Sequence, residues 1–168
     1  MRTIALMTAL ALAAPAAAQN MTITNARLMD GTGAAERANV TITVRDGRIA
    51  SVSDNSAAAG GDVIDAGGNY VTPGLVAAYS TLGIVEVGAV RQTNETDADD
   101  SPYSAALDIA PAVNPASTHM AIARIEGVTS AAAVPSPGSD LFGGMAAIVS
   151  TTATGDTIVR ARAMQYIA

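Results

Sequence analysis

The side chains that could do chemistry in this chain are few. Its 168 residues include one histidine, His119, and they include no cysteine and no lysine. Disulfides, thiolate metal sites and lysine Schiff-base catalysis are therefore excluded. A hydrolytic zinc site needs about three protein ligands drawn from imidazole, thiolate and carboxylate groups. This sequence can supply one imidazole.

Nucleophilic catalysis also finds little support. His119 falls on a predicted helix, and with no second histidine we expect it to be a surface residue and not a general base. Ser136 and Ser139 lie in a loop rich in proline and glycine. No Gly-x-Ser-x-Gly elbow surrounds them, and no acid is placed to orient the histidine, so the pattern does not favour a serine hydrolase.

The densest group of acidic residues lies in the polar segment 91–104. It contains Glu95, Asp97, Asp99 and Asp100. These carboxylates could bind calcium, but the segment lacks the glycine and the ordered spacing of a known calcium loop. The pattern favours a solvated surface loop instead.

The charge balance excludes nucleic acid as a partner. Nine basic residues, all arginine, face fifteen acidic ones, giving a net charge of −6. Binding to phosphates needs a basic face, and these arginines are scattered along the sequence. Aromatic residues make up 3% of the chain, so there is also no platform for base stacking.

Residues 1–18 have the pattern of a secretory signal peptide. Arg2 precedes an apolar stretch, Pro15 interrupts it, and three alanines followed by Gln19 form a cleavage site. The apolar stretch, residues 3–18, is shorter than the ~20 residues that span a bilayer. We therefore predict export to the periplasm or the extracellular space, with no membrane association after cleavage.

The next segment predicts a small antiparallel β unit. Residues 21–29, 39–45, 48–53 and 63–66 have strand patterns, and 54–62 has the composition of a loop. Residues 39–45 alternate most clearly, with valine and isoleucine at one set of positions and threonine at the other. Asp46 and Gly47 predict a type I′ hairpin turn between two of these strands.

Residues 70–83 are mostly apolar and begin around a Pro-Gly pair, a pattern that predicts a buried strand. Residues 84–90 predict another strand.

Residues 117–126 predict a helix capped by Ser117, with Ala121, Ile122 and Ile125 on one face and Gly127 as its stop. Residues 128–134 predict a strand parallel to 70–83, because a helix connects them. A further strand at 145–150 is followed by a hairpin turn at 155–156.

The order of these motifs resembles the amidohydrolase superfamily. Asp-Gly-Arg-Ile at 46–49, the segment 63–68, and then Pro73, Gly74 and Leu75 are similar to the family's β module and first barrel strand. The family pattern continues as Ile-Asp-Ala-His-x-His, and its two histidines bind a catalytic metal. Here the histidine positions are Tyr79 and Thr81. The resemblance spans residues 21 to about 152.

The resemblance implies an α+β fold with an N-terminal antiparallel β-sandwich module and the first βα units of an incomplete TIM-like barrel. The implied domains are a signal peptide at 1–18, the β-sandwich module at 19–68 and the start of the barrel at 69–168. A complete barrel needs roughly 250 residues. We therefore expect the chain to stop in mid-element.

The family hydrolyses cyclic or linear amide C–N bonds with zinc or another divalent metal, which activates a water molecule. Neutral hydroxyls at Tyr79 and Thr81 are poor zinc ligands, so we expect strand-end packing residues there, no cofactor in this chain and no catalysis by the chain alone. A small-molecule substrate is expected only within a longer chain, and no protein partner is indicated. The alternative is a non-catalytic, exported binding or structural β-rich domain.

Overall fold

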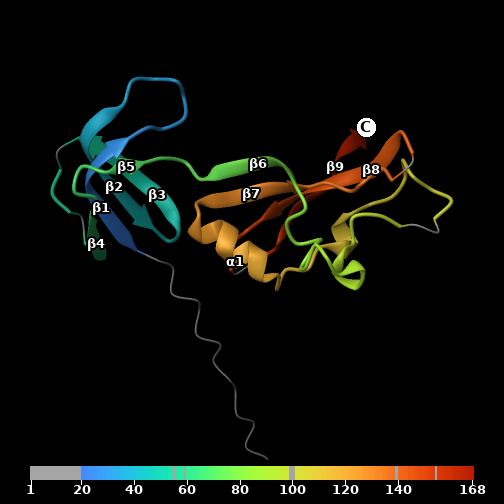
Figure 1. The fold of residues 1–168 in the computed structure, drawn as a ribbon. Coiled ribbons are helices and arrows are strands. Elements are labelled where there is room, and N and C mark those ends of the chain that lie inside the picture. The colour runs from blue at the N-terminus through green and yellow to red at the C-terminus, as the bar shows by residue number, and fades with distance from the viewer. Residues whose placement is uncertain (1–19, 55, 59, 99–100, 139, 154) are drawn as a thin grey trace, which may run out of the picture. The chain divides into compact units, whose positions relative to one another are not determined.

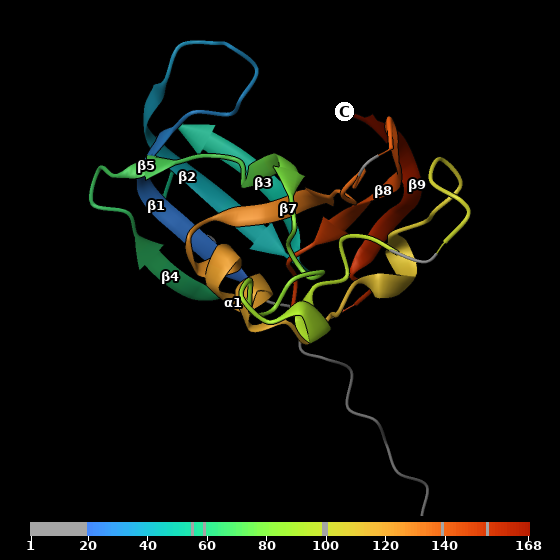
Figure 2. The same ribbon diagram turned by 45° about the vertical axis from the view of Figure 1, so that its right-hand side comes forward.

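The computed structural model describes residues 20–168 except 55, 59, 99–100, 139 and 154. The predicted signal peptide lies outside the described residues. The chain divides into two compact units, Met1–Pro73 and Gly74–Ala168. The described residues are mostly β, with two mixed sheets and one short α-helix (Figures 1 and 2). None of the helices in this part of the chain has the length and apolarity needed to cross a bilayer.

The first unit holds a five-stranded sheet. Its strands are β1 (Met21–Leu28), β2 (Arg37–Arg45), β3 (Arg48–Asp54), β4 (Asp62–Asp65) and β5 (Tyr70–Val71). The order is β3-β2-β1-β4, and β5 also pairs with β1.

The prediction of an antiparallel unit is wrong for its last strand, β4, and the short β5, which lies beyond the predicted unit, also differs in direction. β1, β2 and β3 are antiparallel, whereas β4 and β5 both run parallel to β1. The reason is the connection at residues 55–61, which carries the chain from β3, beyond β2, to the opposite side of β1. β4 therefore enters the sheet in the same direction as β1.

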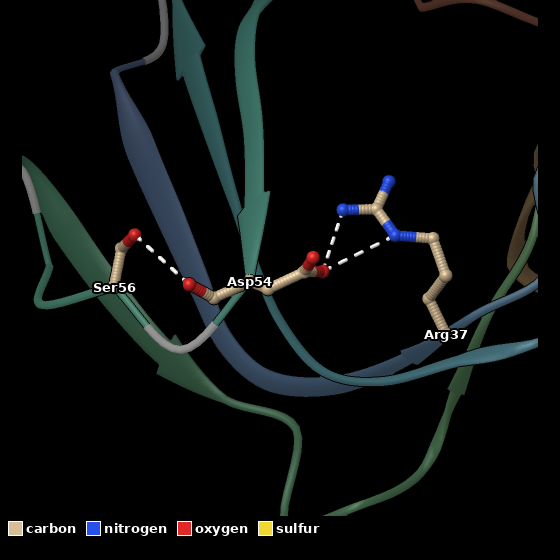
Figure 3. A network of polar contacts seen from close by, with 3 residues as sticks. All are labelled: Arg37, Asp54 and Ser56. Atoms are coloured by element: carbon tan, nitrogen blue, oxygen red, sulfur yellow. Dashed lines mark hydrogen bonds and ion pairs between the residues drawn. The ribbon is translucent and has the colours of Figure 1, made fainter.

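The β2–β3 hairpin forms as the sequence predicts. Asp46 and Gly47 have φ values of 52° and 70°, and both are positive as a type I′ turn requires. Arg37 closes the open end of the hairpin, where its Nε and Nη2 atoms donate to Asp54 Oδ1 at 3.2 and 2.6 Å (Figure 3). This ion pair is solvent-exposed, so it contributes less than about 1 kcal/mol.

Both faces of β2 are buried, although alternation alone predicts one apolar and one polar face. Val40 and Ile42 lie in the core on one side, and Thr41 and Thr43 are buried on the other. The β3–β4 connection covers the threonine face, because the Thr41 hydroxyl donates to the Ser56 carbonyl at 2.7 Å. The Thr22 hydroxyl, on the same face, donates to the Gly60 carbonyl at 2.9 Å.

The second unit is built on a four-stranded sheet in the order β6-β7-β8-β9. The strands are β6 (Leu75–Ser80), β7 (Val128–Ala133), β8 (Phe142–Ser150) and β9 (Ile158–Ile167). The helices are η1 (Arg91–Thr93), η2 (Ala110–Ala112) and α1 (Thr118–Ile125). Figures 1 and 2 show β7 between β6 and β8, with α1 leading into β7.

One βα connection forms as predicted, because β6 and β7 are parallel and α1 lies between them in the sequence. β8 and β9 then continue the sheet as an antiparallel hairpin. The described residues thus contain an open sheet and no closed barrel, and the expectation of further βα units is not met within them. A parallel continuation would need another crossover, whereas the short connections here permit antiparallel neighbours only.

The α1 helix begins where the sequence predicts but buries a different face. Ser117 caps it by accepting a hydrogen bond from the His119 backbone N–H at 3.3 Å, and Gly127 follows its end with φ of 87°. Met120 is the buried residue of the helix, whereas Ile125 is 82% exposed. The helix docks by its first turn, and this aims Met120 at the core.

The main core of the second unit lies on one face of the sheet. Small residues of β7 and β8 form its floor, and side chains from α1 and the 82–113 segment cover it. Its buried members are Ile84, Ile109, Met120, Ala131, Ala133, Ala147 and Val149. Residues 84–90 form turns here and not the predicted strand, and one bridge joins Val85 to Asn94.

Candidate functional site: the end of strand β6

Strand β6 positions Tyr79 and Thr81, the two residues that the sequence motifs align with the histidines of the amidohydrolase pattern. Tyr79 lies near the end of the strand, and Thr81 follows its last residue. β6 is an edge strand with β7 as its partner, and its large side chains are exposed, with Val76 at 68% and Tyr79 at 61%. The prediction of a buried strand is therefore wrong, because an edge strand has a neighbour on one side only.

A bulge in β6 determines where Tyr79 points. Ala77 pairs with Ala131 and Ser80 pairs with Ala133, so three steps along β6 correspond to two along β7. Ala77 packs against the main core. The extra residue places Tyr79 on the opposite face of the sheet, because bulges change the alternation of side chains.

On that opposite face, Tyr79 meets Tyr166 of β9. The ring centroids lie 5.7 Å apart and the planes are tilted by 55°, a geometry favourable for aromatic pairs. Tyr166 also packs on a second cluster of buried residues, Ala132, Val134 and Ala146. The two tyrosines come from the first and last strands of the sheet, with alanines between them.

Two features of the surroundings allow Tyr166 to take this position. Gly143 lies beneath it, and a Cβ atom at residue 143 would stand 2.7 Å from the Tyr166 Cδ1 atom. The strands β6 and β9 would lie roughly 14 Å apart at the usual strand spacing, so the two long side chains must lean toward each other across β7 and β8. Sequence analysis missed Tyr166, since nothing local connects two residues so far apart in the chain.

The electrostatics of the pair oppose metal binding. Hydrogen bonding to Tyr166, followed by its charge and by burial, raises the pKa of the Tyr79 hydroxyl above its ordinary value. A tyrosine binds metal as its phenolate, and here the neutral phenol is favoured further. Thr81 is exposed, and its carbonyl accepts the backbone N–H groups of Ile84 and Val85 at 3.1 and 3.2 Å.

The other candidate residues lie apart from this position. His119 is exposed on the first turn of α1. Ser136 is held in its loop by its backbone N–H, which donates to the Thr96 carbonyl at 2.7 Å. Ser139 lies outside the described residues. We find no arrangement in which His119 and Ser136 form a hydrogen-bonded pair among the described contacts.

The acidic segment 91–104 begins with η1, and its described residues after Thr93 belong to no helix or strand, as the sequence predicts. Asn94 Oδ1 accepts the backbone N–H and the hydroxyl of Thr96 at 3.0 and 2.7 Å, so it is engaged in a local turn. Asp99 and Asp100 lie outside the described residues. Across the part of the chain that is described, no group of three or more His, Cys, Asp or Glu side chains is placed to hold a metal ion.

Three depressions in the described part of the chain lie near the acidic residues, and one of them, of about 170 Å³, is lined in part by Glu95 and Asp97. A cavity of about 130 Å³ includes Asp97, Tyr103 and Asp140 in its lining, and it is smaller than the roughly 300 Å³ of ordinary ligand sites. An open depression of about 480 Å³ contains Glu86 and Glu95. Glu86 there accepts a hydrogen bond from the Asn114 amide at 3.0 Å, which makes it part of a structural contact.

Comparisons with known proteins agree with this geometry at the level of the fold. No model of a known protein family matches the chain, and a search of curated proteins finds no match. Among solved structures, the chain is similar to the crystal structure of an amidohydrolase from Thermotoga maritima MSB8, with a TM-score of 0.74 and 21% sequence identity. The match covers 88% of this chain and 38% of that one.

The chain thus has an amidohydrolase-like fold and spans less than two fifths of the length of the solved structure that it matches. The resemblance that the sequence motifs indicate is confirmed in this structural sense.

Proposed function

We propose that this chain is the front part of an amidohydrolase architecture in which the first metal-binding pair has been replaced by a packing pair. Residues 19–68 correspond to the β-sandwich module, and residues 69–168 to the start of the barrel. The partial match to a solved amidohydrolase supports this proposal, and so does the order of the motifs around Pro73 and Gly74. Relatives in this family hydrolyse non-peptide C–N bonds.

The position of Tyr79 supports the second part of the proposal, that this chain alone does not hydrolyse amides. Tyr79 stands at a histidine position of the family pattern, yet its ring contacts Tyr166. The pKa of its phenol is raised, which disfavours the phenolate that would bind a metal. The sequence supplies one histidine, no cysteine and no lysine. A catalytic zinc needs about three protein ligands and an open position for water.

The test compares the wild-type chain with the Tyr79→His/Thr81→His double variant. Zinc content is measured by elemental analysis, and turnover is measured on hydantoin-type and dipeptide-type substrates. We expect zinc affinity to rise slightly in the double variant, because it regains one ligand pair. Hydrolysis is expected to stay at background in both proteins, because further ligands are still missing. Stoichiometric zinc in the wild type, with turnover that a chelator abolishes, would refute the proposal.

Export is a separate part of the proposal and rests on residues 1–18. Their pattern is that of a cleavable signal peptide. Expression of the full chain in a bacterium, followed by fractionation and N-terminal sequencing, tests it. We expect the mature protein in the periplasm or the medium, beginning at Gln19. Recovery of uncleaved protein in the cytoplasm would contradict this assignment.

A second candidate function, binding to a protein partner, is favoured by the exposed edge of β6. Leu75, Val76 and Tyr79 are large, exposed side chains on a strand that has one neighbour. Such edges accept an added strand in many complexes. A monomer that unfolds cooperatively without metal would support this non-catalytic function, and aggregation of the purified chain would count against it.

A further inference from the structure

Tyr79, which stands at a histidine position of the family pattern, and its neighbour Tyr166 can undergo a reaction that histidines cannot. Two phenol rings that come from different strands and lie side by side are the reactants of an oxidative ring-to-ring coupling. Tyr79 and Tyr166 meet this condition, with ring centroids 5.7 Å apart. Tyr79 is 61% exposed, so a diffusing oxidant can reach it.

We propose that Tyr79 and Tyr166 form an oxidative modification site, at which a one-electron oxidant of the peroxidase class joins their rings into a dityrosine bridge. The bridge would covalently tie β6 to β9, the two edge strands of the second sheet. This inference goes beyond the proposed function, because it concerns the chemistry of the side chains that are present and not of the missing ligands.

The reaction balances with hydrogen peroxide as the final oxidant. Each phenol loses one electron and one proton, which gives two phenoxyl radicals. A carbon–carbon bond forms between ring positions next to the hydroxyls, and the two hydrogens on those carbons move to the oxygens to restore the phenols. The two electrons and two protons released reduce one hydrogen peroxide to two waters.

The structure favours this pair over the other tyrosines. The chain has four tyrosines. Tyr70 lies beneath the Arg27 guanidinium, which is 5.1 Å from its ring centroid. Tyr103 is exposed and belongs to the loop after the acidic residues. Neither has a tyrosine ring recorded beside it among the described contacts.

The surroundings also fix the position of the Tyr166 ring and leave the Tyr79 ring free to rotate. Tyr166 is half-buried over Gly143 and over the cluster around Ala132, so its position is defined. The more exposed Tyr79 can rotate on a nanosecond timescale to bring its reactive carbon closer. The pKa of the Tyr79 hydroxyl is raised, mainly by its interaction with Tyr166, which agrees with the two phenol rings lying side by side.

The experiment treats the purified full-length chain with a peroxidase and hydrogen peroxide at low protein concentration. The monomer is then isolated by size exclusion, and its dityrosine fluorescence and peptide masses are measured. We expect a linked peptide pair containing residues 79 and 166, lighter by two hydrogen atoms than its parts. Methionine oxidation adds oxygen to the mass, so it is distinguished from coupling.

Four single variants give the matched comparison. Tyr79→Phe and Tyr166→Phe should each reduce monomer fluorescence to the level of untreated protein, because phenylalanine keeps the ring but has no phenol to oxidise. Tyr70→Phe and Tyr103→Phe should retain the wild-type signal. Circular dichroism and a melting curve for each variant show whether it is folded.

Two further outcomes decide the proposal. Coupling in the wild type should be lost in concentrated urea and should not depend on protein concentration, since it is intramolecular and needs the fold. The bridged monomer should also melt at a higher temperature, as expected for a link across a long loop. If the folded monomer gives no 79–166 peptide, or if Tyr70→Phe and Tyr103→Phe remove the signal, the proposal is overturned.

Discussion

The two faces of the β6-β7-β8-β9 sheet are built from similar residues but are completed differently. On one face, Ala131, Ala133 and Ala147 lie beneath α1 and the 82–113 segment, which shield them from solvent. On the other face, Ala132 and Ala146 are covered by Ile148 and Tyr166, beside exposed side chains such as Val76. The first face is therefore a conventional core, and the second is a shallow surface with an aromatic cover.

This difference bears on the proposal that a packing residue, Tyr79, stands in place of a metal ligand. The face with the conventional core carries α1, which lies in the connection between the parallel strands β6 and β7. The residue that departs from the family pattern, Tyr79, points to the other face. Under the proposed function, a tyrosine in place of a metal ligand would exchange a charged site for ring packing and would leave the core on the first face unchanged.

The largest expected effect is on the face with the conventional core. Met120→Ala removes a buried side chain from between α1 and the sheet, and we expect a loss of about 2–4 kcal/mol in the free energy of unfolding. Ile125→Ala, on the same helix but 82% exposed, is the matched control and should change stability by less than about 0.5 kcal/mol. Urea denaturation followed by circular dichroism measures both.

Equal effects of Met120→Ala and Ile125→Ala would show that α1 does not dock through its first turn. The distinction between the two faces would then fail.

The next effect is expected where β6 begins. A Cβ atom on Gly74 would lie 2.1 Å from the Thr129 Cγ2 atom of β7, so Gly74→Ala forces the two strands apart. We expect a loss of about 1–3 kcal/mol, typical of overpacking. Gly88→Ala is the control, because a Cβ there meets nothing within 4 Å. The midpoints of urea denaturation report both changes.

Should Gly74→Ala prove as stable as Gly88→Ala, the close approach of β6 to β7 would be incorrect. The bulge that directs Tyr79 would then lose its support as well.

Local patterns predicted the local structure of this chain well. The positive φ values at Asp46 and Gly47, the Ser117 cap and the existence of strand β2 all follow from residue types within a few positions of one another. The turn, the helix start and the strand depend on short-range sterics and hydrogen bonds, which the types of the adjacent residues determine.

The predictions that failed depend on distant parts of the chain. The parallel direction of β4 follows from where the 55–61 connection crosses, and the exposure of β6 follows from its place at the edge of the sheet. Met120 is buried because its turn of α1 faces the core. The Tyr79–Tyr166 pair needs a bulge in β6 and the approach of side chains from the two edge strands of the sheet. None of these has a signal within a short window of sequence.

The smallest expected effect concerns the titration of Tyr79, on the face of the sheet that carries Tyr166. Because its pKa in the folded chain is raised by Tyr166, the folded state favours the neutral phenol. The stability that results is present below the ordinary tyrosine pKa near 10 and is lost as the pH rises through the folded pKa. Since Tyr79 is largely exposed, we expect a small change in stability and a clearer change in the titration curve. Phenolate absorbance should show a late ionisation step from Tyr79, and Tyr166→Phe should remove this step while Tyr70→Phe retains it. A late step that survives in Tyr166→Phe would mean that the two phenols do not interact, and this face of the sheet would then lack the contact that distinguishes it.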